Sequence, residues 1–125
     1  MTSYSPEIDG EPDPGEVVWA WVPYEDDPAQ GKDRPVLVLA DQGGMLACLY
    51  MTSKDHDRDA ADEARYGRHW MDVGTGGWDP EGRESEIRLD RLITIPESEV
   101  RREGAALDQA TFDAVLAAAR VHWGQ

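Results

Sequence analysis

Short runs of β-branched and aromatic residues, each ended by a turn or a proline, most constrain how this chain can fold. The runs occupy residues 16–22, 34–40, 45–53, 69–73 and 84–95, the last as one strand or as a bent pair. Runs of this kind, about 8–12 residues apart, are typical of antiparallel strands. Pro23 ends the first run, and Pro35 is tolerable only at the start of the second, because proline has no donor for the ladder. The pattern predicts a mainly β fold with a polar loop over residues 24–33.

One helical pattern closes the chain. Its apolar residues recur at helical spacing and are Phe112, Val115, Leu116, Ala119 and Trp123. Asp108 is a favourable N-cap before them, and Gly124 stands where helices commonly stop. One helix after several short strands predicts a small, strongly bent β-barrel or sheet with the helix packed on it.

The domain organisation follows from length and composition. A chain of 125 residues is expected to form one domain. Residues 1–14 are acidic and rich in proline and glycine, a composition that buries too little surface to offset the entropy of ordering. We therefore expect a flexible acidic tail over residues 1–14 and a single domain over residues 15–125.

The charge is strongly negative but unevenly distributed. With 26 acidic and 12 basic side chains, the formal net charge is −14. This charge argues against sequence-independent binding of nucleic acid, which depends on neutralising phosphates with lysine and arginine. Residues 2–27, however, contain no basic residue, whereas several arginines are gathered in residues 83–102. A local site can therefore still be basic on this acidic chain.

Apolar patterning and cysteine content bear on the compartment. The longest apolar run, residues 45–51, is far shorter than the ~20 residues of a membrane helix. Residues 1–14 contain no apolar core of the kind that a signal peptide needs. Cys48 is the single cysteine, and in an apolar strand it is expected to be a buried, inert thiol. We expect a cytoplasmic protein without a membrane partner.

Motifs for metals and nucleotides are incomplete. Asp55, Asp57 and Asp59 resemble the start of a calcium loop, but Ala60 stands where glycine is needed and Tyr66 where a bidentate glutamate belongs. The glycine-rich stretch 74–77 is followed by no helix that would aim amides at a phosphate. The scattered histidines, 56, 69 and 122, have no partner at ligand spacing. The sequence predicts neither a metal site nor a cofactor.

Polar and cationic residues gather at the ends of three predicted strands. The groups are residues 31–35 at the start of the second strand, residues 52–54 at the end of the third, and residues 88–90 on the last. Because side chains alternate along a strand, Arg88 and Asp90 point to the same side. Hydroxyls beside cations form a plausible anion site, and arginine presents a planar fork suited to phosphate oxygens. The alternative is that Arg88 and Asp90 form a surface ion pair of ~0–1 kcal/mol and that Thr52 and Ser53 simply end a strand.

The order of these blocks along the chain resembles the MazF/PemK (Kid) family of bacterial toxins. The resemblance covers residues 14–122 and is most specific in residues 31–39 and 84–95. It implies an SH3-like barrel with a C-terminal helix, a homodimer, and a metal-independent endoribonuclease that cuts single-stranded RNA at short sequences. It also implies a cognate antitoxin protein that occludes the site.

The resemblance assigns catalytic roles to four residues. Arg34 matches the arginine of the family's RP motif, and Thr52 matches the threonine that ends the third strand. Arg88 and Asp90 match an Arg-Xaa-Asp pair that some members use for acid and base chemistry, which makes Asp90 the candidate base. The implied reaction is attack of a ribose 2′-hydroxyl on the adjacent phosphate, giving a 2′,3′-cyclic phosphate and a 5′-hydroxyl.

Further residues are candidates for substrate binding. Lys32, Ser53 and Lys54 stand beside the catalytic candidates and are expected to hold phosphate oxygens. Trp78, with Trp70 and Tyr24, is a candidate for stacking on unpaired bases. The alternative for these aromatic side chains is packing in the core or in a dimer seam.

Two other functional classes stay open. The acidic loop over residues 25–30 contains no histidine, although some family members have one before the RP motif. Together with the net charge of −14, this loop keeps open a non-catalytic SH3-like binding module that has lost the activity. The third class is a toxin of the same fold that acts on a protein such as a gyrase.

Overall fold

The computed structural model describes residues 14–24, 27, 29–52, 69–79 and 81–122. The expected acidic tail over residues 1–14 lies outside these ranges except for Pro14, and so does the charged segment 54–68 with its calcium-like aspartates. Within the described part, no helix is long and apolar enough to cross a membrane.

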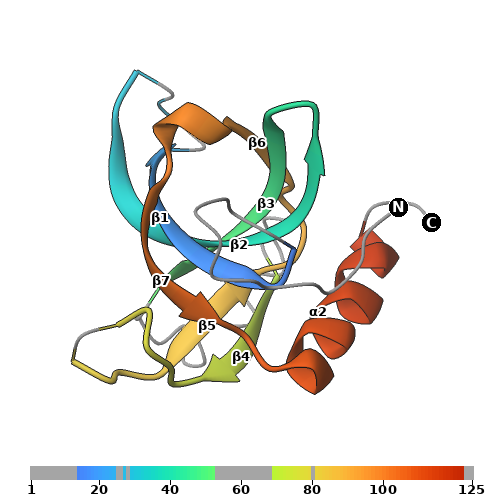
Figure 1. Ribbon diagram of the computed structural model, residues 1–125. Helices are drawn as coiled ribbons and strands as arrows, with labels where there is room; N and C mark the ends of the chain where they lie inside the picture. Colours follow the sequence, from blue (N-terminus) through green and yellow to red (C-terminus); the bar gives the residue numbers. More distant parts are fainter. Residues whose placement is uncertain (1–13, 25–26, 28, 53–68, 80, 123–125) are drawn as a thin grey trace.

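One curled antiparallel sheet forms most of the described fold (Figure 1). Its strands are β1 (Glu16–Pro23), β2 (Gly31–Gln42), β3 (Met45–Thr52), β4 (Trp70–Gly74), β5 (Ser85–Arg88), β6 (Ile93–Pro96) and β7 (Arg101–Ala106). The order across the sheet is β4-β5-β3-β2-β1-β7, and β6 pairs with β3. A short 3₁₀ turn, η2 (Glu97–Glu99), joins β6 to β7. Helix α2 (Gln109–His122) follows β7. The predicted bent sheet with a C-terminal helix is confirmed.

Two details differ from the sequence-based expectation, and one open alternative is decided. Gly31–Asp33 belong to β2 instead of a loop, because they pair with the end of β1, Gly31 opposite Pro23. Of the two alternatives for residues 84–95, the pair of strands is the one observed, since β5 pairs with the end of β3 and β6 with its beginning. The strand β7 was not predicted, because its residues show no apolar alternation. It is held by pairing with the edge of β1.

The sheet has a buried layer on each face. One layer joins the sheet to α2 and contains Val17, Leu37, Leu39, Leu49, Met51 and, from the helix, Phe112, Val115, Leu116 and Ala119. The other layer uses the alternate residues of the same strands, including Val18, Ala20, Val36, Val38, Cys48 and Tyr50. Alternation along each strand therefore sets which side chains meet the helix and which line the inside of the curl.

Two local predictions are confirmed. The Thr111 backbone N–H donates to Asp108 Oδ2 at 3.1 Å, so Asp108 caps the N-terminus of α2. Cys48 is fully buried, and burial raises the pKa of its thiol to about 12. A thiol with so high a pKa forms almost no reactive thiolate at neutral pH.

Candidate functional site

A pocket of about 130 Å³ lies where the end of β3 meets the start of β2. It is lined by Trp19, Lys32, Asp33, Arg34, Pro35, Met51, Thr52 and Arg83. The structure thus brings Lys32, Arg34 and Thr52, predicted from separate blocks of sequence, to one place. Asp33, the carboxylate in the lining, is paired with Arg101 at 3.1 Å. The pocket therefore combines cations and a hydroxyl, the groups that suit a phosphate.

Arg34 is held at this pocket by an aromatic ring. Its guanidinium carbon lies 5.6 Å from the centre of the Tyr50 ring, within the range of a cation–π contact. Among the residues that the structure describes, none accepts a hydrogen bond from this guanidinium. Arg34 is only partly buried and keeps its fork of donors available for a ligand.

Thr52 ends β3 and shares a side of the sheet with Tyr50, two residues earlier. Its partner across the ladder is Glu86 of β5, a buried carboxylate. Both Thr52 and Glu86 have interactions with other residues. The end of β3 thus places Thr52 in the lining of the pocket, with Glu86 directly across the ladder.

Arg88 and Asp90 form a second group of polar side chains, which contacts the hydroxyl of Tyr50. Arg88 is 2% exposed, and its Nε and Nη2 donate to Asp90 Oδ1 and Oδ2, both at 2.8 Å. Its Nη1 donates to the Tyr50 hydroxyl at 2.7 Å. The prediction that both side chains lie on one side is confirmed. The two side chains do form an ion pair, but it is not on the surface, because Arg88 is buried and Asp90 is largely covered.

The surroundings of Asp90 set its acidity. Partial burial raises the pKa of the carboxyl, but hydrogen bonds from Arg88 and from the His69 backbone N–H outweigh it, so the pKa lies below its usual value. Such a carboxylate stays ionised at neutral pH and is a weak proton acceptor. Asp90 thus joins β5 to the residue before β4 and fixes the orientation of Arg88.

Tyr50 is the centre of a cationic cluster that the sequence analysis missed. Guanidinium carbons of Arg34, Arg88 and Arg91 lie 5.6, 5.9 and 5.4 Å from its ring centre. Trp70 meets the same ring edge-on, with the centroids 5.9 Å apart, and Arg91 donates to the Pro23 carbonyl at 3.2 Å. The period-two relation between Tyr50 and Thr52 was the available signal, since it places both on one side of β3. Within this cluster, Asp90 is paired with Arg88.

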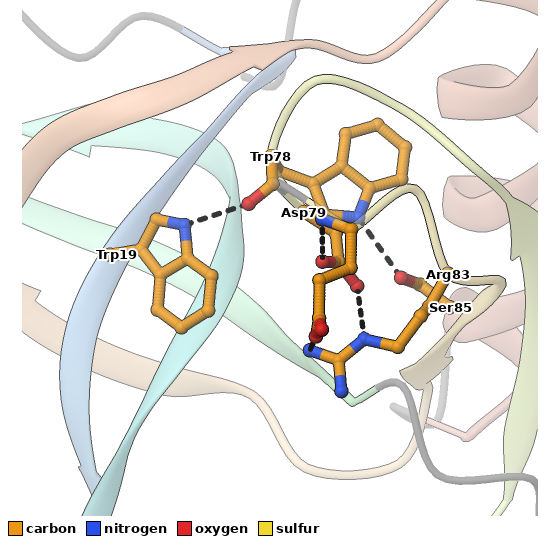
Figure 2. A network of polar contacts seen from close by, with 6 residues as sticks. Trp19, Trp78, Asp79, Arg83 and Ser85 are labelled. Carbon is orange, nitrogen blue, oxygen red and sulfur yellow. Dashed lines mark hydrogen bonds and ion pairs between the residues drawn. The ribbon is translucent and has the colours of Figure 1, made fainter.

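The loop between β4 and β5 places Arg83 in the lining of the pocket. Figure 2 shows the contact of Arg83 with Asp79 of the same loop. Arg83 Nε donates to Asp79 Oδ2 at 2.9 Å, and the Glu81 backbone N–H donates to Asp79 Oδ1, also at 2.9 Å. The Glu81 N–H and then Arg83 hold the pKa of the Asp79 carboxyl below its usual value, against the effect of burial. Sequence reasoning missed Arg83 as a lining residue because its position depends on this loop conformation.

Trp78 belongs to the base of the same loop. Its side chain is 2% exposed, its indole N–H donates to Ser85 Oγ at 3.0 Å, and its carbonyl accepts from Trp19 Nε1 at 3.0 Å. Figure 2 shows this network between β1 and the loop. Trp78 does not line the pocket, so its role in base stacking stays a prediction that its burial does not favour.

The structure describes only some of the remaining candidate residues. Lys32 lines the pocket and is exposed. Ser53 and Lys54 lie outside the described residues. Within the described ranges, no three His, Cys, Asp or Glu side chains are grouped as metal ligands.

The described residues thus form a curled β-sheet with one packed helix and a cationic pocket at the end of β3. The family described as PemK-like, MazF-like toxin of type II toxin-antitoxin system matches residues 13–122. The chain therefore belongs to this family. No curated protein sequence matches it.

A solved structure supports the fold. The MazE-MazF complex (Form-II) from Deinococcus radiodurans contains a chain similar to this one, with a TM-score of 0.62 and 18% sequence identity. The similarity covers 94% of this chain and 99% of that chain. The two chains thus share a fold over nearly their whole lengths.

Proposed function

We propose that this chain is an endoribonuclease toxin that cuts single-stranded RNA without a metal ion. The observation that carries the proposal is the pocket in which Arg34, Thr52 and Lys32 meet, with no described carboxylate paired to Arg34. A phosphate diester placed there would meet two cations and a hydroxyl. These groups are the ones that stabilise a phosphorane-like transition state.

The proposed reaction is internal transesterification. The ribose 2′-oxygen forms a bond to the adjacent phosphorus, the bond to the 5′-oxygen breaks, and the products are a 2′,3′-cyclic phosphate and a 5′-hydroxyl. Negative charge builds on the phosphate oxygens, the 2′-hydroxyl loses its proton to solvent, and the leaving 5′-oxygen takes up a proton. Arg34 suits charge stabilisation and proton donation to the leaving oxygen, but a guanidinium has no free lone pair to serve as a base. Thr52, together with Ser53, orients the 2′-hydroxyl or holds a phosphate oxygen.

Arg88 and Asp90 have a different part in this proposal. Each polar nitrogen of Arg88 already donates a hydrogen bond, and both Asp90 oxygens accept one. A carboxylate with a lowered pKa is a weak base. We therefore assign the pair to positioning: it fixes Tyr50, and Tyr50 holds Arg34 at the pocket.

The proposed partners rest on membership of the family. The similar Deinococcus radiodurans chain was solved in a MazE-MazF complex. We infer that this chain likewise has a cognate antitoxin protein, that it acts as a homodimer, and that it works in the cytoplasm.

The test is incubation of the purified protein with a long RNA of varied sequence in the presence of EDTA, followed by mapping of cut sites and end groups. We expect cuts at a short recurring sequence, with cyclic phosphate and 5′-hydroxyl ends. A substrate with a 2′-deoxy sugar at the mapped position is the matched control and should stay intact. Uncut RNA with folded protein would overturn the proposal in favour of a binding module or a toxin that acts on a protein.

A further inference from the structure

Trp21 is a large aromatic side chain left in solvent beside the pocket. The residue is 49% exposed, whereas Trp78 is buried. Its position on β1 follows from alternation: Trp19 and Trp21 lie on the same side of the strand, about 7 Å apart along it. Trp19 lines the pocket, and the partner of Trp21 across the ladder, Asp33, lines it too. Trp21 therefore stands at a ladder position adjoining residues that line the proposed phosphate site.

A glycine on the neighbouring strand makes room for this indole. A Cβ atom at Gly31 would lie 2.6 Å from Cζ2 of Trp21, closer than real side-chain contacts allow, and would also meet the Val22 carbonyl oxygen. The ring therefore rests on β2 at a position where any other residue would displace it. A ring supported on one side and exposed elsewhere is a preformed surface for stacking.

The side chains around Trp21 are charged. Asp33 is paired with Arg101 of β7, and Lys32 follows Gly31 on β2. This single aromatic ring lies among charged groups and close to residues of a cationic pocket. Such a surface suits a nucleobase whose phosphate is bound in the pocket. It suits an apolar face of a protein less well.

We propose that Trp21 stacks on a base of single-stranded RNA adjoining the phosphate that Arg34 and Thr52 hold. This inference rests on the proposed function and adds a base-binding subsite to it. Stacking on an aromatic side chain does not depend on base identity, so Trp21 contributes affinity for the strand at this position instead of reading a sequence.

The experiment measures binding of two labelled oligomers of about 10 nucleotides by fluorescence anisotropy. One is a 2′-O-methyl RNA, which has no attacking hydroxyl, and the other is an abasic strand of the same length. We expect Trp21→Ala to weaken binding of the first oligomer by about 5- to 100-fold and to leave binding of the abasic strand unchanged. Trp21→Phe should recover most of the loss. Met45→Ala is the matched control, because Met45 is 40% exposed and begins β3, at the other end from Thr52.

The possible failures are distinguishable. If Trp21→Ala binds the base-containing oligomer as the wild type does, while the wild type cuts RNA, the stacking subsite is wrong and the proposed function stands. An equal loss for both oligomers would also contradict stacking. A change in sedimentation coefficient for Trp21→Ala would place Trp21 between copies of the chain and overturn the subsite. Wild-type protein that neither binds nor cuts RNA would overturn the proposed function and the subsite together.

Discussion

Arg34 and Arg88 lie against the same tyrosine ring but in opposite environments. Arg34 is partly exposed, lines a pocket, and donates to no described acceptor. Arg88 is 2% exposed and is bonded to Asp90 and to the Tyr50 hydroxyl. Two arginines that the family resemblance both marks as catalytic are thus separated by burial into one suited to a ligand and one suited to the fold.

The physical reason for the difference is the cost of burying charge. A guanidinium without solvent needs hydrogen-bond partners of its own, and a bidentate carboxylate supplies them to Arg88. A guanidinium that is to bind phosphate must be left without such a partner. The comparison predicts that changes to Arg88 and its partners act on stability, whereas changes at the pocket act on cleavage.

Arg88→Ala should give the largest effect on stability. The substitution leaves the Asp90 carboxylate partly buried without its partner, which we expect to lower the free energy of unfolding by about 3–5 kcal/mol. Urea unfolding measures this change. Arg101→Ala is the matched control: its pair with Asp33 is about half exposed on both sides, so its loss should cost less than about 1 kcal/mol. Equal effects of the two substitutions would contradict the assignment of Arg88 to the fold.

Thr52→Val should slow cleavage by about 100-fold, because a hydroxyl that holds the reacting groups is lost while the side-chain shape is kept. Single-turnover cleavage of an RNA oligomer measures the rate. Thr52→Ser, which keeps the hydroxyl, should retain most of the activity. An inactive serine variant with normal stability would show that the hydroxyl is not the group in use.

Tyr50→Phe distinguishes the role of Arg88 in the fold from the role of Arg34 at the pocket. It removes the hydroxyl that accepts from Arg88 Nη1 but keeps the ring that lies against Arg34. We expect a loss of about 1–3 kcal/mol in unfolding free energy and a cleavage rate within a few-fold of the wild type. A cleavage rate that fell as far as in an Arg34 variant would mean that the hydroxyl itself takes part in the reaction.

A smaller effect is expected on the unfolding free energy at low pH. Because the pKa of Asp90 is lowered in the folded chain, its charge stabilises the fold above its usual pKa near 3.8, and this contribution is lost as the pH falls through the folded value. The difference in unfolding free energy between wild type and Asp90→Asn should therefore be constant from neutral pH down to about 5 and should narrow below about 3.8. A difference that stays constant down to about pH 3 would contradict the ion pair.

Sequence patterns predicted the strands and the helix where apolar alternation is strong, as in β1 to β3 and α2. They failed for β7, whose arginines, glutamate and small residues carry no alternation and whose position depends on pairing with β1. The sequence blocks predicted part of the site, because their residues Lys32, Arg34 and Thr52 line one pocket. The burial of Trp78 and Arg88, the approach of Arg83 and the exposure of Trp21 depend on contacts between distant segments, which spacing along the chain does not determine.

The central claim is that Arg34 serves the reaction and not the fold. The most direct test measures the cleavage rate and the unfolding free energy of Arg34→Ala in the same preparation, with Arg34→Lys beside it to keep the charge without the planar fork. The account predicts a cleavage rate about 1000-fold below the wild type with an unfolding free energy within about 1 kcal/mol of it. Full cleavage by Arg34→Ala, or a loss of cleavage explained by unfolding, would contradict it.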